Sequence, residues 1–261
     1  MRIATVGDNC IDYYDEPGTA YFGGNPVNVA VYLSRLAEQA SYTGVVGDDG
    51  FGAQMIAALK SKNVDISHCH TVPGATAVTH VSVVNGDRVF GAYVEGVLAD
   101  FKLSADDIDF LCQHDLVVSG IWGNIDSQLA AIRARGVPIA FDFSDQLEHP
   151  IVEKAMGDVD YAFFAATAED GPELRAFLKK HQARGPRCVT VTLGDKGSLA
   201  YDGKEFFKCG IVPCTVVDTM GAGDSYIAGF LRGVLLGEPI SRCMALGAEN
   251  SSITLQYQGA W

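Results

Sequence analysis

The stretch Val216-Val217-Asp218-Thr219-Met220-Gly221-Ala222-Gly223-Asp224-Ser225 predicts a strand that runs into a glycine turn, followed by an amphipathic helix. Glycines at 221 and 223 let the backbone turn tightly, so that successive amide groups point toward one spot at the start of the predicted helix. Such a spot binds anions. Asp224 falls in the first turn, where its carboxylate is placed to accept a proton from an attacking hydroxyl. The alternative is a glycine-capped helix start whose Asp is favoured by the helix dipole alone.

Two other glycine-rich nucleotide sites do not fit the sequence. In a Rossmann site the third glycine position is occupied here by Tyr226, Asp224 intrudes, and fewer than forty residues follow to build the unit. A Walker loop needs G-x-x-x-x-G-K-[ST], which does not occur. The run Gly194-Asp195-Lys196-Gly197-Ser198 has the wrong spacing.

Outward from this stretch, short β-branched runs alternate with longer helical patterns. Strands are predicted at 3–7, 42–46, 115–118, 139–143, 162–165, 188–193 and 199–201. Helices are predicted at 25–36, 53–60, 127–134, 173–182, 224–236 and 239–256. This alternation predicts a three-layer α/β/α fold, a mostly parallel wound sheet with helices on both faces.

Two segments, about 8–22 and 76–97, contain no good helical pattern. The second predicts a hairpin of strands 77–84 and 88–94 around Asn85-Gly86-Asp87, because Asn-Gly between alternating apolar positions favours such a turn. A hairpin outside the strand–helix rhythm indicates a small β-sheet lid beside the main sheet. We therefore expect residues 1–261 to form one domain that carries this lid.

Composition excludes several classes of protein. The 261 residues include 19 basic and 32 acidic ones, a formal charge of −13, which argues against nucleic acid as a partner. Seven scattered cysteines without C-x-x-C indicate reduced thiols rather than disulfides or a thiolate zinc site. No signal-peptide or membrane-spanning run is evident, so we expect a cytoplasmic protein that does not contact membranes.

The stretch Asp218–Ser225 resembles the C-terminal signature of the ribokinase-like sugar kinases, the phosphofructokinase B superfamily. The resemblance implies an ATP-dependent transfer of a phosphoryl group to a sugar hydroxyl. In the family the amides at Gly221, Ala222 and Gly223 form an anion hole for the transferring group, and the Asp, here Asp224, is the catalytic base.

A second element, Gly23-Gly24-Asn25-Pro26-Val27-Asn28, is similar to the family's N-terminal G-G-x-x-x-N. The resemblance implies that Gly23, Gly24 and Asn28 contact the sugar, and that Asp12 binds its hydroxyls. Taken alone, the element is also a plain glycine turn before a helix.

Further family elements follow in order along the chain. The run 44–52 resembles a structural G-x-V-G-x-D-x-[FY]-G turn, and 258–260 matches the terminal G-A element. The nucleotide loop T-L-G-x-x-G corresponds to 192–197, and an Asn beside adenine corresponds to Asn250. The resemblance thus implies ATP contacts at Thr192, Gly194, Gly197, Thr219 and Asn250.

The chain departs from the family at its N-x-x-E element. The stretch is Ala165-Ala166-Thr167-Ala168-Glu169, so Ala166 replaces the Asn while the Glu remains. The resemblance still implies Mg²⁺ with ATP, contacted by Glu169 through water. It also implies a monovalent cation such as K⁺ near Asp218, as in some members of the family.

Two other groups of polar residues are candidate binding sites for a metal or for phosphates. His68-Cys69-His70 suggests a metal site, but one strand face cannot present all three residues and no fourth ligand is nearby in the sequence. We therefore expect the start of a strand there and no metal. Asp142 and Asp145 end a predicted strand, where they either face phosphates or cap a loop.

Within the family the chain most resembles the bacterial fructosamine kinases. The shared features are the compact lid at 88–97, Gly120-Ile121-Trp122-Gly123 and the ending Gln258-Gly259-Ala260-Trp261. The resemblance implies phosphorylation of the 6-hydroxyl of a fructoselysine-type substrate, whose amine would lie near Tyr93 and Glu95. Fructose-asparagine, fructose, ribose or a nucleoside remain alternatives.

Lids in this family often pair between subunits, so the resemblance also implies a homodimer. Two rivals from other classes remain. One is a sugar- or nucleotide-binding protein that kept the fold without catalysis, and the other is a nicotinamide oxidoreductase. Retention of Asp224 with both glycines argues against the first, and the failed Rossmann pattern argues against the second.

Overall fold

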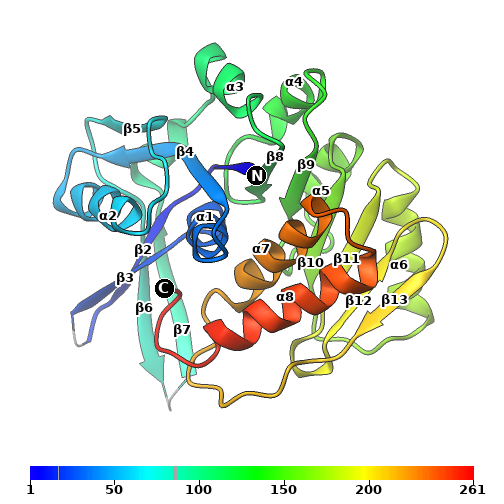
Figure 1. Ribbon diagram of the computed structural model, residues 1–261. Helices are drawn as coiled ribbons and strands as arrows, with labels where there is room; N and C mark the ends of the chain where they lie inside the picture. Colours follow the sequence, from blue (N-terminus) through cyan, green and yellow to red (C-terminus); the bar gives the residue numbers. More distant parts are fainter. Residues whose placement is uncertain (17, 85–86) are drawn as a thin grey trace.

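A large sheet of nine strands forms the centre of the protein in this computed structural model, which describes residues 1–16, 18–84 and 87–261 (Figure 1). Its strand order is β13-β12-β11-β10-β9-β8-β1-β4-β5. The strands are β1 (Arg2–Val6), β4 (Gln39–Gly47), β5 (Cys69–Val72), β8 (Leu116–Gly120), β9 (Ile139–Asp142), β10 (Tyr161–Ala165), β11 (Cys188–Thr192), β12 (Ser198–Tyr201) and β13 (Phe206–Cys209). All neighbours are parallel except at β12 and β13.

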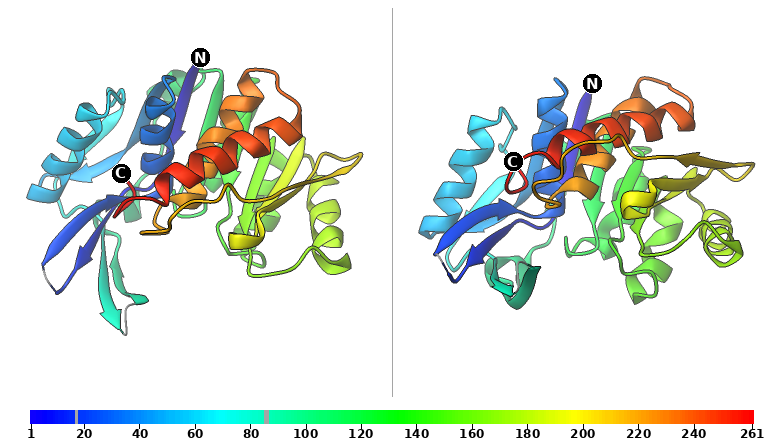
Figure 2. Two further views of the ribbon diagram at one scale, coloured as in Figure 1. Left: turned by 60° about the horizontal axis from the view of Figure 1, so that its bottom comes forward. Right: turned by 90° about the horizontal axis from the view of Figure 1, so that it is seen from below.

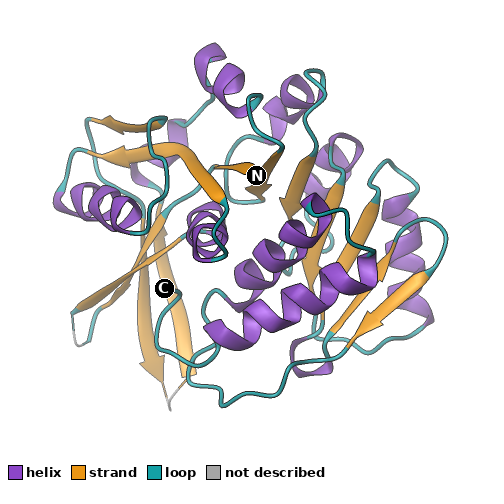
Figure 3. Cartoon of the chain, viewed as in Figure 1, coloured by secondary structure: helices purple, strands orange, loops and turns teal. Residues whose placement is uncertain are grey.

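Helices cover both faces of this sheet, as Figure 3 shows. One buried core contains side chains from α3 (Ala105–Leu111), α4 (Leu129–Arg133), α5 (Pro150–Ala155) and α6 (Pro172–Gln182). The second core, on the opposite face, contains side chains from α1 (Asn25–Arg35), α2 (Gly50–Ser61), α7 (Ala222–Leu235) and α8 (Ile240–Thr254). Short 3₁₀ turns lie at η1 (Gly96–Asp100), η2 (Asp126–Gln128), η3 (Met156–Asp158) and η4 (Gly194–Lys196).

The central strands are buried on both sides, which explains their composition. Every residue of β8 is buried, and all but the first residue of β1 and of β4 are buried. Parallel strands between two helical layers favour such continuous apolar runs over strict alternation. The expected three-layer α/β/α fold is confirmed.

A separate sheet of four strands projects from the large sheet, as both views in Figure 2 show. Its order is β3-β2-β6-β7, with strands β2 (Cys10–Tyr14), β3 (Thr19–Gly23), β6 (Val78–Val84) and β7 (Asp87–Val94). The two segments that lack helical patterns thus pair with each other across the chain, through β2 and β6. The predicted hairpin strands are confirmed, while its turn residues 85–86 lie outside the described residues.

Several elements were missing from the sequence prediction. They are the edge strand β13, the helices α3 and α5, and the strands β2 and β3, while only the start of the edge strand β5 had been expected. The strand predicted before the glycine turn at 221–223 does not form, because Val216 and Val217 lie exposed in a loop without a neighbouring strand among the described residues. Edge strands are short and half-exposed, so their periodicity is weak, and β2 and β3 form only because the lid sheet assembles around them. A capping box at Ser104 and Asp107 was a usable signal for α3. In the described part of the chain no helix has the length and hydropathy to cross a membrane.

Candidate active site

The carboxyl ends of neighbouring parallel strands lie at one edge of the large sheet. Strands β1, β8 and β9 are adjacent and parallel there. Asp8 follows β1 by two residues, and Asp142 ends β9. The first turns of α1 and α7 reach the same place, since Asn25 of α1 hydrogen-bonds both Asp142 and Asp224. This edge is where open α/β sheets bind ligands.

The turn that begins α7 requires glycine. Gly221 caps the helix in the left-handed region at φ 71°, and a Cβ there would meet the Tyr32 hydroxyl and Ala260. A Cβ at Gly223 would meet nothing within 4 Å, so the space above this turn is open. The first amides of a helix have no acceptor within it. The turn at 221–223 thus has the glycine geometry on which the predicted anion hole depends, with Asp224 beside it, while the Ala222 N–H donates to Thr219 O at 3.3 Å. Anion binding at this turn stays a prediction.

Two amide side chains from α1 hold the Asp224 carboxylate. Asn28 Nδ2 donates to Asp224 Oδ2 at 2.7 Å, and Asn25 Nδ2 donates to Asp224 Oδ1 at 2.7 Å. Asn28 Oδ1 in turn accepts a hydrogen bond from the Trp261 indole nitrogen at 2.8 Å. That bond fixes which end of the Asn28 amide faces Asp224. Trp261 thus orients the Asn28 amide, which in turn orients the Asp224 carboxylate.

Three carboxyl groups share this site. Asn25 Nδ2 also donates to Asp142 Oδ2 at 2.9 Å, and the Asn25 backbone N–H donates to Asp8 Oδ2 at 3.2 Å. Desolvation is the largest of the effects that raise the pKa of Asp8 and of Asp142 to about 7, and the nearby charge of Asp224 contributes to the rise. No ion pair with Lys, Arg or His involves the three among the described residues.

The pKa of Asp224 is set by two opposing effects. Desolvation raises the pKa, and the hydrogen bonds from Asn28 and Asn25 lower it. Desolvation is the larger effect, so the pKa of Asp224 is raised to about 6. A carboxylate with a pKa in this range is ionised at neutral pH and is still a better proton acceptor than an exposed one.

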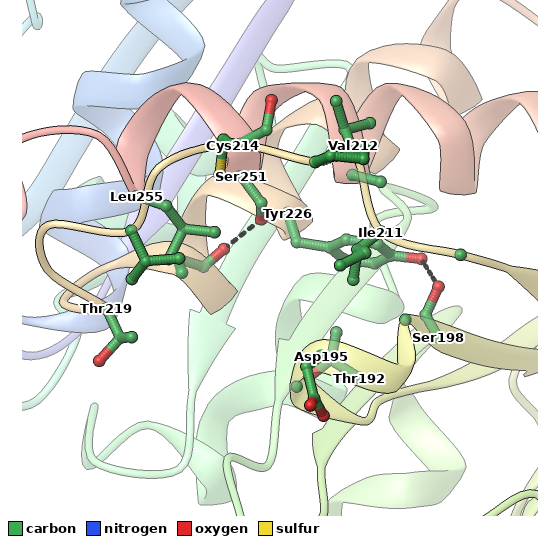
Figure 4. A pocket seen from close by; sticks show the side chains of 18 of the residues that line it. Thr192, Asp195, Ser198, Ile211, Val212, Cys214, Thr219, Tyr226, Ser251 and Leu255 are labelled. Carbon is green, nitrogen blue, oxygen red and sulfur yellow. Dashed lines mark hydrogen bonds between the residues drawn. The ribbon is translucent and has the colours of Figure 1, made fainter.

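A cavity of about 490 Å³ lies next to the start of α7 (Figure 4). Its wall includes Thr192, Gly194 and Gly197 from the loop after β11, and Thr219, Ala222 and Gly223 from the α7 turn. Ile211, Val212, Val216 and Leu255 supply apolar surface. Figure 4 shows Thr219 toward one side of the cavity and Ile211 and Ser198 toward the other. An elongated ligand with a flat apolar group and an anionic end fits this arrangement.

Asn250 is not part of this wall, which corrects the expectation that it lies beside adenine. Its side chain is 2% exposed and is used inside the protein. Asn250 Nδ2 donates to Ser225 O at 2.7 Å, and its Oδ1 accepts from Arg35 Nη2 at 2.7 Å. Ala248, Ser251 and Ser252 of the same helix line the cavity instead.

The other residues expected to bind substrate lie in or beside the lid sheet. Gly23 ends β3, and a Cβ there would lie 2.9 Å from Asp12 Oδ2, so the missing side chain makes room for this carboxylate. Gly24 caps α1 at φ 105°. Tyr93 on β7 is half exposed, and its pKa is raised by burial, with Cys10, Asp8 and Glu95 among its ionisable neighbours. These neighbours include Asp8 of the site.

The two expected metal contacts have protein partners. The side chain of Glu169 is 84% exposed and pairs with Lys196 Nζ at 2.9 Å, beside the loop that lines the cavity. Asp218 is buried and accepts hydrogen bonds from Met220 N, Gln258 Nε2 and Gly259 N, each at 2.9 Å. Asp218 thus ties the α7 turn to the C-terminus.

Sequence reasoning passed over three residues of the site. Asn25 lay inside the quoted element Gly23–Asn28, and Asp8 directly followed a predicted strand, so both had a positional signal. Trp261 had none, since its bond to Asn28 spans almost the whole chain.

The open helix start, the carboxylate beside it and the adjoining cavity are the geometry of a kinase acting on small molecules. The family model for pfkB carbohydrate kinases matches residues 14–261. The chain belongs to this family, whose members are ATP-dependent phosphotransferases, typically with Mg²⁺.

Individual relatives agree with this assignment. The chain is 46% identical to fructoselysine 6-kinase of Escherichia coli, with 99% of each chain covered. It is 31% identical to a fructosamine kinase of Bacillus subtilis, covering 100% of this chain and 93% of the relative. The structure of Arabidopsis thaliana ribokinase, solved with ribose and ATP, superposes with a TM-score of 0.88 at 23% identity, covering 99% and 93% of the two chains. The ribokinase-like resemblance is confirmed.

Replacing Trp261 with Phe should lower kcat by about two- to tenfold, the usual effect of one lost hydrogen bond. Phe keeps an aromatic ring against Phe22, on which Trp261 stacks, but removes the donor to Asn28. The measurement is steady-state turnover alongside the melting temperature. An unchanged kcat in a fully folded variant would show that Asn28 needs no such support.

Proposed function

We propose that this protein phosphorylates the 6-hydroxyl of a fructosamine of the fructoselysine type, using ATP. The observation that carries the chemistry is Asp224, held by two amides beside an open helix N-terminus. The full-length similarity to fructoselysine 6-kinase supports the choice of substrate.

In the proposed reaction Asp224 accepts the proton of the sugar 6-hydroxyl as its oxygen attacks the γ-phosphorus of ATP. A new O–P bond forms, the bond from the γ-phosphorus to the β,γ-bridging oxygen breaks, and ADP leaves. Amides at Gly221, Ala222 and Gly223 stabilise the charge on the transferring group. Asn25 and Asn28 keep the carboxylate aimed at the hydroxyl.

The nucleotide would occupy the cavity beside α7. We place the adenine against the apolar wall of Ile211, Val212 and Leu255, and the phosphates toward Thr219 and Gly223. Mg²⁺ bound to ATP would neutralise part of the phosphate charge. Glu169 would hydrogen-bond to water molecules on this ion after giving up its ion pair with Lys196. A monovalent cation near Asp218 remains an expectation; equal rates in potassium, sodium and tetramethylammonium buffers would refute it.

The sugar would lie between the strand ends and the lid. Asp12 and Asn28, with the backbone at Gly23 and Gly24, would bind its hydroxyls. Among the described residues Asn28 has one amide hydrogen without a protein partner, which suits this task. Tyr93 and Glu95 would face the substituent that carries the amine.

We also propose a homodimer through the lid sheet. Tyr93 and Val94 at the end of the edge strand β7 are 42% and 49% exposed, and unpaired strand edges are natural sites of association. A monomeric mass by light scattering at micromolar concentration would refute this assembly.

Replacing Asp224 with Asn should lower kcat by roughly 10²–10⁴-fold, the usual contribution of a general base. ATP affinity should stay nearly unchanged, because the amides of the α7 turn remain. The measurements are coupled turnover and nucleotide binding, with the exposed Asp106→Asn as a control that keeps full activity. A variant that retains more than about a tenth of the wild-type kcat would exclude the base role and reopen the non-catalytic alternative.

The pH profile should follow the ionisation of Asp224. Its pKa is raised from 3.8 to about 6, and only the ionised form accepts a proton. Turnover should therefore rise with pH through about 6, and about a tenth of the molecules should carry the ionised base at pH 5. Rates at saturating ATP between pH 5 and 8 test this, and a flat profile would contradict it.

A fructosyl-amino acid should exceed free fructose in kcat/KM by at least about tenfold. A charge-assisted contact from Glu95 to its amine would supply about 1.5–3 kcal/mol. Replacing Glu95 with Gln should narrow this preference and leave the activity on fructose intact. The assay compares fructoselysine, fructose-asparagine, fructose, ribose and a nucleoside. If kcat/KM for fructose or ribose equals that for fructoselysine and fructose-asparagine, the fructosamine assignment is wrong, and only the assignment as a sugar kinase remains.

A further inference from the structure

A cluster of two histidines and an aspartate lies away from the active site. His68 lies in the turn directly before β5, and His70 is the second residue of that strand. Both imidazoles point to one side, since each lies within hydrogen-bonding distance of the same Asp107 oxygen. Cys69 between them packs against the core that contains α1 and α2. The sequence-based objection that one face cannot present all three residues therefore holds for Cys69 but leaves the two imidazoles together.

The third group comes from a helix. Asp107 of α3 is 1% exposed, and its Oδ1 lies 2.9 Å from His68 Nδ1 and 2.8 Å from His70 Nε2. The three candidate ligand atoms all lie within 4.8 Å of one another. The ligand that the neighbouring sequence did not offer is thus supplied by the fold.

The environment of Asp107 keeps one oxygen directed at the histidines. Its Oδ2 accepts hydrogen bonds from Ser104 N at 2.9 Å and Ser104 Oγ at 2.7 Å. Its Oδ1 therefore remains for the two imidazoles, and metal-ligating carboxylates are usually held by further hydrogen bonds in this way.

We propose that His68, His70 and Asp107 bind a divalent transition-metal ion of the zinc type. Two imidazole nitrogens and a carboxylate oxygen are a common zinc ligand set, completed to four by water. Ligand atoms of a tetrahedral site with bonds of about 2.0–2.1 Å lie about 3.3 Å apart. The Asp107 oxygen lies 2.9 Å and 2.8 Å from the two imidazole nitrogens, and all three atoms lie within 4.8 Å of one another, so small side-chain shifts would reach this spacing. The half-exposed His70 leaves a path for the ion.

The position of the site gives the ion a structural task. The chain between His70 and Asp107 contains β6 and β7, two of the four strands of the lid sheet. An ion bound to all three residues links the segment that enters the lid to the helix that follows it. Such a link closes a loop around the lid and limits its opening. None of the three residues His68, His70 and Asp107 lies in the proposed catalytic machinery, so the inference is independent of the proposed function.

The test is a zinc titration of the full chain, freed of metal with EDTA and of any affinity tag, in competition with a chromogenic chelator. Wild type should bind one ion per chain and melt at a higher temperature when loaded. His70→Ala should weaken binding at least about tenfold, the minimum expected for a lost ligand. This variant leaves the Ser104–Asp107 cap in place, so it should fold.

His80→Ala is the matched control, because His80 is similarly exposed and also pairs with a carboxylate, Asp15 at 2.7 Å. It should bind zinc like wild type. Equal affinity of wild type and His70→Ala, or an equal loss in His80→Ala, would overturn the site. Amide exchange in β6 and β7 should slow when zinc binds wild type but not His70→Ala, and unchanged exchange in the loaded wild type would overturn the linking role.

Discussion

The rest of the site depends on how the Asp224 carboxylate is held. It is desolvated and has no cationic partner in the part of the chain that the structure describes, and two amides from a single helix supply its hydrogen bonds. Neutral amide donors keep the carboxylate ionised and fix its direction. A guanidinium would also bind it, but its positive charge would offset the negative charge of the carboxylate. Helix α1 must therefore start where it does, and its glycine cap at Gly24, where a Cβ would meet the Asn9 backbone, fixes that start.

Around this carboxylate the parallel sheet brings together groups that are far apart in the chain. Asp8 follows β1 and Asp142 ends β9, and Asn25 connects both of them to Asp224. Three acidic groups in one desolvated place raise one another's pKa values. Such a site favours protons, and it attracts cations that accompany a substrate. A nucleotide carrying Mg²⁺, as the kinases of this family typically use, suits this electrostatic character.

The second sheet stands apart from this edge and is joined to it by few segments of the chain. Its strands come from two segments of the chain, joined through β2 and β6, and only short connections lead back to the large sheet. Tyr93 brings the lid within electrostatic reach of Asp8. The histidine–aspartate cluster lies outside the active site, and its residues flank β6 and β7 in the sequence, so the proposed ion would link the two ends of the segment that supplies half of this sheet.

The sequence by itself determined the alternation of strands and helices, the glycine turn at 221–223 and the position of Asp224 in the helix that follows it, because these follow from local periodicity and glycine stereochemistry. It also placed the lid, though not the strands within 8–22, whose pairing is non-local. Only the tertiary structure decided the roles of Asn25, Trp261 and Asp107, and turned Asn250 away from the cavity. Each of these depends on a hydrogen bond between residues at least 25 apart, which no local pattern encodes.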